Sequence, residues 1–148
     1  MALLERSLEA SNKKRHLTIT IGALVLIAAI VLWFTFRFYP EQLAAQRFFD
    51  ALVAGDMNGA YKLWKAGPSY RFQDFVADWG PHGYYGPVKS YKIKKVSSPP
   101  GPSNSVVVEA EVSPFSPMPD PQDAEKSRRT RDVTLWVNSN DKSLSFPP

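Results

Sequence analysis

One uninterrupted apolar run near the N-terminus, residues 17–36 (LTITIGALVLIAAIVLWFTF), constrains the folding of this chain most. No charged residue lies between His16 and Arg37. At about 1.5 Å of rise per residue, a helix of this length matches the roughly 30 Å hydrocarbon core of a bilayer. A helix that is apolar on every side needs lipid or a large protein core around it, and the rest of the chain is too short to supply that core. The run therefore predicts a transmembrane helix over residues 17–38.

A cleaved signal peptide is the main alternative, because Lys13, Lys14 and Arg15 precede the run. However, the run is longer than the usual hydrophobic region of about 7–15 residues, and it ends in bulky residues where cleavage requires small ones. We expect these bulky aromatic residues to lie at the membrane interface. They are Trp33, Phe34, Phe36, Phe38 and Tyr39. The run is therefore predicted to stay in the lipid bilayer as an anchor.

The basic residues around the run predict its orientation. Three of them lie at 13–15, whereas Arg37 is the first basic residue on the other side. The positive-inside rule then places residues 1–16 in the cytoplasm, as a short disordered tail, and residues 39–148 outside it. In a bacterium this describes a single-pass protein of the inner (cytoplasmic) membrane with a periplasmic domain.

Charge and composition exclude several classes of function. The net charge of +4 divides into +3 for residues 1–40 and +1 for residues 41–148, so the basicity belongs mostly to the topology signal. We therefore expect no nucleic-acid partner. The chain has no cysteine, and its two histidines, His16 and His82, are predicted on opposite sides of the membrane. These residues offer no thiolate or histidine cluster for a metal, and we predict no cofactor.

The hydrophobic period changes along residues 39–148, from a helical to a strand pattern. Three short helices are predicted first, and strands that alternate apolar and polar residues follow. The helices are expected at 41–55, at 56–64 with Asp56 as N-cap, and at 70–79 with Ser69 as cap; the strands at 88–96, 106–112, 133–137 and 143–146; and loops at 97–104 and 113–127. This order predicts an α+β domain with its helices packed on one face of a curved antiparallel sheet.

The segment AAQRFFDALVAGDMNGAYKLW, residues 44–64, is followed by a helical stripe of Phe72, Phe75 and Trp79, a glycine-rich turn and the strands. This pattern resembles the nuclear-transport-factor-2-like superfamily, in the membrane-anchored form of uncharacterised bacterial families. The resemblance implies a cone-shaped α+β fold. It does not select an activity, because some members are isomerases or dehydratases with acid and base residues in the cone, and others bind partners or support assemblies.

The polar residues near the end of the predicted third helix are the candidates for chemistry. His82, Tyr84 and Tyr85 lie in PHGYYGP and form a possible ligand-binding group at the mouth of a cavity. Asp74 and Asp78 are four residues apart, on a helix row that we expect to be solvated. Because no second histidine or carboxylate is spaced to complete an acid–base pair, we assign no catalytic residue.

Contacts with another protein are the other possible role. Phe115 and Met118 lie in the proline-rich loop, and Trp136 is predicted to point outward from its strand. Proline stiffens a loop and reduces the entropy lost when it docks, although surface loops also tolerate insertions that have no function.

Two functions are compatible with these features of the sequence. The first is a non-catalytic accessory or assembly subunit that contacts other membrane protein subunits through its extracytoplasmic domain. The second is a small-ligand-binding domain or a lyase or isomerase that uses the cone cavity. A polar cavity with His82 facing inward would favour the enzyme. A filled interior would favour the subunit, and the residues expected to fill it are Phe48, Phe72, Phe75 and Trp79.

Overall fold

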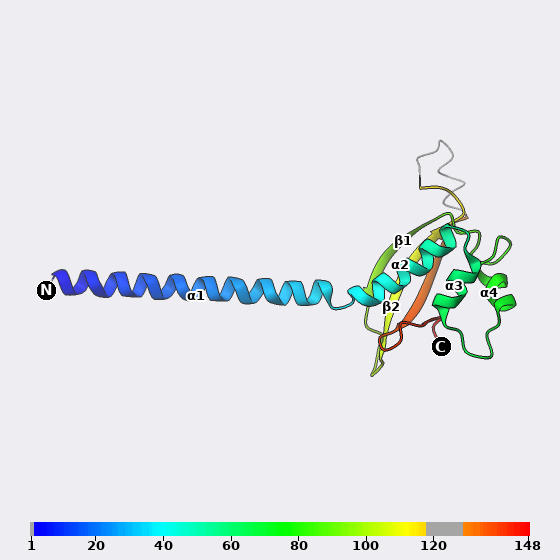
Figure 1. The fold of residues 1–148 in the computed structure, drawn as a ribbon. Coiled ribbons are helices and arrows are strands. Elements are labelled where there is room, and N and C mark those ends of the chain that lie inside the picture. Colours follow the sequence, from blue (N-terminus) through cyan, green and yellow to red (C-terminus); the bar gives the residue numbers. More distant parts are fainter. Residues whose placement is uncertain (1, 118–128) are drawn as a thin grey trace. The chain divides into compact units, whose positions relative to one another are not determined.

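The structure, a computed structural model, describes residues 2–117 and 129–148. The chain divides into two units, Met1–Arg37 and Phe38–Pro148 (Figure 1). The predicted contact residue Met118 and most of the loop predicted at 113–127 lie outside the described residues.

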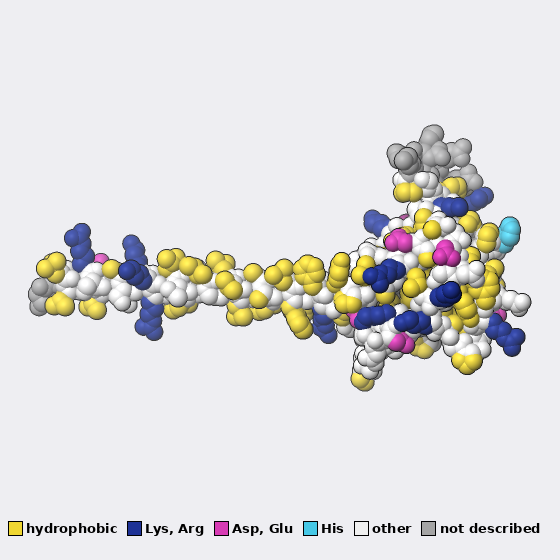
Figure 2. Space-filling view, in the orientation of Figure 1, with side chains coloured by type: hydrophobic (Ala, Val, Ile, Leu, Met, Phe, Trp, Pro, Cys, Tyr) yellow, Lys and Arg dark blue, Asp and Glu magenta, His cyan; other side chains and the backbone are white. Residues whose placement is uncertain are grey.

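The first unit is a single helix, α1 (Ala2–Phe36), which is long and apolar enough to cross a membrane. Hydrophobic side chains cover it beyond the basic residues near its start (Figure 2). The hydroxyls of Thr18, Thr20 and Thr35 each donate to the carbonyl four residues earlier, so these polar groups are satisfied within the helix.

The expected disorder of residues 1–16 is wrong, because α1 already begins at Ala2. Nucleation is the costly step of helix formation, and the apolar run provides it. The preceding residues include Leu, Glu, Lys and Arg, which are good helix formers, and no proline or glycine interrupts them.

The second unit begins with α2 (Tyr39–Val53) and α3 (Met57–Trp64). Pro40 lies in the first turn of α2, where its missing N–H removes no intrahelical bond. The predicted N-cap Asp56 is confirmed, because its carboxylate accepts from the backbone N–H of Gly59 at 2.9 Å. Gly55 precedes this cap with a φ of 77°, a left-handed conformation that suits glycine and turns the chain between the helices.

The next helix is α4 (Phe72–Trp79), and its cap differs from the prediction. Arg71, not Ser69, is the N-cap residue, because the Asp74 carboxylate accepts from the Arg71 backbone N–H at 2.8 Å. An acidic residue at the third helical position satisfies a free N–H at the start of a helix in this way. The helix therefore starts at Phe72 and not at 70.

The sheet consists of β1 (Ser90–Ser97), β2 (Ser105–Ser113), β3 (Arg131–Asn138) and β4 (Leu144–Ser145), in the order β1-β2-β3-β4. All neighbouring strands are antiparallel, which confirms the predicted α+β class and sheet type. The buried residues of β2 and β3 alternate as predicted and point to the core. They are Val106, Val108, Ala110, Val112, Val133, Leu135 and Val137.

Aromatic rings fill the space between the helices and the sheet. Figure 1 shows α2 lying across the strands, and its contacts with β1, β2 and β3 agree. Three of the four rings expected in the interior are there, since Phe48, Phe75 and Trp79 are 0% exposed. The fourth expectation is wrong, because Phe72 is 37% exposed at the start of α4. Its ring contacts Tyr61 and Phe75 from the outside of the core.

Candidate functional site

The loop after α4 carries the predicted group His82, Tyr84 and Tyr85. Backbone hydrogen bonds fold this loop onto the last turns of α4, including one of 2.8 Å from the Tyr85 N–H to the Asp78 carbonyl. Gly86 lies so close to the carbonyl of Gly80 that a Cβ would be 1.9 Å from this oxygen. The close approach excludes a side chain at position 86 and fixes the direction in which the tyrosines leave the helix.

The structure brings Tyr84 and Tyr85 together and leaves His82 apart from them. The Tyr84 ring meets the Tyr85 ring edge-on, with centroids 4.8 Å apart, and Tyr84 is 62% exposed. Tyr85 is half-buried and stacks on Trp79 at 4.9 Å. His82 is exposed, does not line the adjacent hollow and forms no hydrogen bond with any described residue.

Two arginines complete this surface: Arg131 is the first residue of β3, and Arg129 precedes that strand by two residues. The Arg131 guanidinium lies 4.9 Å from the centroid of the Tyr84 ring, and the Arg129 guanidinium lies 5.9 Å from that of Phe115. Both arginines line an open hollow of about 290 Å³ together with the two tyrosines. We call this the arginine–aromatic surface. Its residues are Tyr84, Tyr85, Pro114, Phe115, Arg129 and Arg131.

The predicted partner residues do not form one patch. Phe115 lies at the arginine–aromatic surface, because its ring faces the Arg129 guanidinium, and the Ser90 hydroxyl donates to its backbone carbonyl at 2.6 Å. The side chain of Trp136 and that of its neighbour Leu135 lie on opposite faces of the sheet. Trp136 pairs with Val107, towards the end of β3 that is farther from Arg131. The structure therefore unites Phe115 with the tyrosines predicted as a ligand group and separates both from Trp136.

Two tyrosines of this region, Tyr85 and Tyr70, have a raised pKa. Burial raises the pKa of Tyr85 above its ordinary value of 10.0, with smaller contributions from Tyr84 and Asp78. Burial also raises the pKa of Tyr70, whose hydroxyl donates to the Asp78 carboxylate at 2.5 Å. Asp78 is therefore half-buried and hydrogen-bonded, contrary to the solvated position that we expected for it.

The residues of this site do not form a recognisable catalytic arrangement. Within residues 2–117 and 129–148, no group of three or more His, Cys, Asp or Glu side chains could hold a metal ion. Asp74 caps α4 and Asp78 binds a tyrosine, so both carboxylates already have structural hydrogen bonds. The arrangement instead presents aromatic rings and guanidinium groups to an approaching surface.

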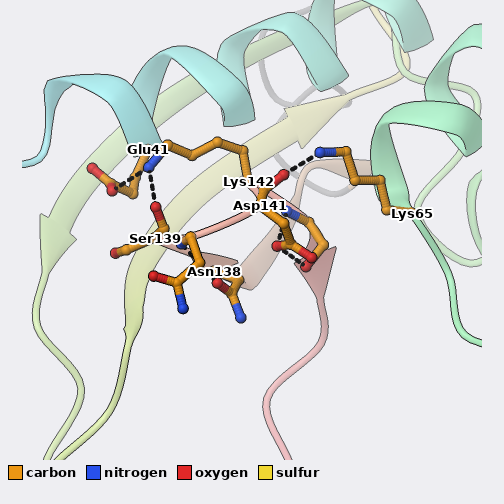
Figure 3. Close-up of polar contacts among 8 residues, drawn as sticks. Glu41, Lys65, Asn138, Ser139, Asp141 and Lys142 are labelled. Atoms are coloured by element: carbon orange, nitrogen blue, oxygen red, sulfur yellow. Dashed lines mark hydrogen bonds and ion pairs between the residues drawn. The ribbon is translucent and has the colours of Figure 1, made fainter.

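A second polar cluster joins the start of α2 to the turn between β3 and β4 (Figure 3). The Lys142 ammonium lies 2.8 Å from the Glu41 carboxylate and also donates to the Ser139 carbonyl. Nearby, the Lys65 ammonium donates to the Asp141 carbonyl. We call the pair of Glu41 and Lys142 the α2 clamp. This pair was not predicted, because no periodic pattern in the sequence links two residues 101 positions apart.

The electrostatics of the α2 clamp favour the ionised carboxylate. Glu41 is 6% exposed, and this burial by itself would raise its pKa. The hydrogen bond from Lys142, together with smaller contributions, outweighs burial and holds the pKa below its ordinary value of 4.5.

No protein-family model matches the chain, and comparison with curated proteins and with solved structures gives no match either.

Proposed function

We propose that this chain is a single-pass membrane protein and a non-catalytic accessory or assembly subunit of a larger membrane protein complex. In this proposal α1 is a retained anchor, its N-terminus lies in the cytoplasm, and the unit Phe38–Pro148 is a cone-shaped, nuclear-transport-factor-2-like domain outside it. The domain binds other subunits through the arginine–aromatic surface. The order of helices before an antiparallel sheet supports the proposed fold.

The arginine–aromatic surface is the observation that carries this proposal. Tyrosine and arginine are enriched among the residues that contribute most to binding at protein interfaces. Here an exposed Tyr84 ring lies under the Arg131 guanidinium and beside a half-buried Tyr85, so the surface is both apolar and positively charged. The filled interior also supports a contact function over the alternative of an enzyme that uses a cone cavity.

The proposed orientation predicts which parts of the chain an external reagent reaches. Because the chain has no cysteine, Ser69→Cys and Ser11→Cys each introduce a single thiol at an exposed position. A membrane-impermeant maleimide added to intact spheroplasts should label Ser69→Cys at once and Ser11→Cys only after lysis. The opposite pattern would reverse the orientation, and a mature protein that begins beyond Tyr39 would replace the anchor by a signal peptide.

The proposed contact predicts a loss of partners on truncation of Tyr84. We expect Tyr84→Ala, and separately Arg131→Ala, to weaken binding of the partner subunit by about 30-fold, since a residue of this kind contributes about 2 kcal/mol. Tagged full-length protein is purified in mild detergent, and the subunits that accompany it are quantified by mass spectrometry.

His82→Ala is the matched control for this experiment, because His82 is exposed on the same loop but lies outside the arginine–aromatic surface. This variant should retain the partner. Purification of the unmodified protein as a lone monomer, or equal retention by all variants, would contradict the proposal.

A further inference from the structure

A second hollow of about 350 Å³ lies next to the α2 clamp. One face of α2 forms a wall, since residues at i, i+3, i+4 and i+7 lie on the same side of a helix. The end of α3 and the turn between β3 and β4 form the rest. We call it the α2 groove, and its lining residues are Pro40, Leu43, Ala44, Arg47, Leu63, Lys65, Asp141, Lys142 and Leu144.

The charged residues of the α2 groove leave it positive. Three cations line it against one carboxylate, that of Asp141, which accepts from the backbone N–H and hydroxyl of Ser143. Glu41 offsets the charge of Lys142 from outside the lining. The Lys65 ammonium donates to the backbone carbonyl of Asp141, and its charge is offset in part by the Asp141 carboxylate.

Arg47 is the cation without a partner in this groove. Its side chain is exposed and forms no hydrogen bond or ion pair with any residue in the described part of the chain. A guanidinium group binds the two oxygens of a phosphate side by side, which makes it a good receptor for phosphate esters. Leu43 and Leu63 provide an apolar wall beside it.

Few residues of the sequence separate the first lining residue of the groove from the apolar run. Pro40 lines the groove and follows Phe36, the last residue of α1, by four residues. Four residues span at most about 14 Å even when they are fully extended. A lipid headgroup at the end of a membrane-spanning α1 would therefore lie within reach of the first turns of α2.

From these observations we infer that the α2 groove binds the headgroup of an acidic phospholipid of the membrane that anchors the chain. Arg47 and Lys65 bind the phosphate, and the apolar wall of Leu43 and Leu63 lies against the glycerol and the first carbons of the acyl chains. Both parts of the ligand match the groove, since the phosphate is anionic and the acyl carbons are apolar. The inference rests on the proposed anchoring of α1 but does not depend on a partner subunit.

Native mass spectrometry of the full-length protein in detergent tests this inference. Phosphatidylglycerol and phosphatidylcholine are titrated separately, and the dissociation constant of the tightest bound lipid is measured. Arg47→Gln should weaken phosphatidylglycerol binding about fivefold, the effect of one basic residue at an anionic membrane surface, and should weaken phosphatidylcholine binding less, because the choline ammonium neutralises the phosphate that both lipids carry. Because Arg47 has no partner to lose, its substitution should not alter the tryptophan fluorescence of the folded domain.

Lys92→Gln is the matched control, because it removes the same charge from an exposed position on β1 that does not line the groove. This variant should bind phosphatidylglycerol as tightly as the unmodified protein does. The basic residues at 13–15 are the same in every sample, so they contribute no difference between the variants.

Three outcomes would contradict either the inference of a lipid site or the proposed membrane anchor. Equal affinities for the Arg47→Gln variant and the unmodified protein would overturn the inference. It would also be overturned if soluble glycerol 3-phosphate bound as tightly as the lipid, because the site would then serve a free phosphate ester. Failure of the protein to enter detergent micelles would instead contradict the anchor, and with it the premise of the inference.

Discussion

Replacement of Phe48 by alanine should lower the free energy of unfolding of the domain by about 3–5 kcal/mol. The Phe48 ring is 0% exposed, and its centroid lies 5.1–6.1 Å from those of four other rings. They are Phe49, Trp64, Phe75 and Trp79. Close-packed interiors relax only partly around a deleted side chain, so the variant loses both the burial of the ring and the contacts of its neighbours.

Phe72→Ala is the control for this variant, because it removes the same side chain from a position that is 37% exposed. It should cost about 1 kcal/mol, a typical value for a point mutation, because the ring still contacts Tyr61 and Phe75. Both variants are measured in the full-length protein by chemical denaturation followed by near-ultraviolet circular dichroism. Equally small losses would mean that the interior tolerates a void at Phe48, which would favour the ligand-binding alternative over an accessory subunit.

The fold could be predicted largely because two periods are strong in this sequence. Val106, Val108, Val133 and Leu135 alternate with polar residues, and their burial follows the alternation. The N-cap of α4 was less predictable. It is Arg71, because the carboxylate of Asp74, inside the helix, accepts a hydrogen bond from the Arg71 backbone N–H. The first strand also departs from strict alternation, because the register of β1 and β2 shifts between Ile93 and Lys95.

The candidate site could be predicted only in part. The glycine and tyrosine residues in PHGYYGP indicated Tyr84 and Tyr85 as candidates for binding, since a glycine-rich turn places aromatic rings near the surface. Arg129 and Arg131 were missed, although SRRTR at 127–131 is a visible basic cluster. Their position beside the tyrosines depends on the register of the sheet, which pairs Arg131 with Val112 and thus brings it near the end of β2. No local pattern contains this information.

Loss of the ion pair in the α2 clamp is the second change that we expect to destabilise the domain strongly. Lys142→Met should lower the free energy of unfolding by about 3 kcal/mol, because it leaves the Glu41 carboxylate buried without its counter-ion. Methionine is unbranched and only one atom shorter than lysine. Like lysine it is an L-residue at a left-handed φ of 59°, so the backbone strain changes little. The double variant Glu41→Gln with Lys142→Met should recover most of this loss, since no charge then remains buried. An equal or larger loss in the double variant would show that the stability comes from packing and not from the ion pair.

The same pair predicts how stability changes with pH. The pKa of Glu41 is lowered in the folded chain, so below about pH 4.5 the unfolded chain binds more protons at this residue than the folded one. The contribution of Glu41 to stability is therefore fully present above the unfolded pKa and is lost as the pH falls through the folded pKa.

Denaturation of the unmodified protein and of Glu41→Gln across this acidic range measures the contribution as the difference between the two free energies of unfolding. We expect this difference to shrink with acidification, whereas a constant difference would mean that Glu41 does not titrate with a lowered pKa. Because Glu41 lies in the first turn of α2, acidification should then loosen the turn between β3 and β4 from the helix that follows α1.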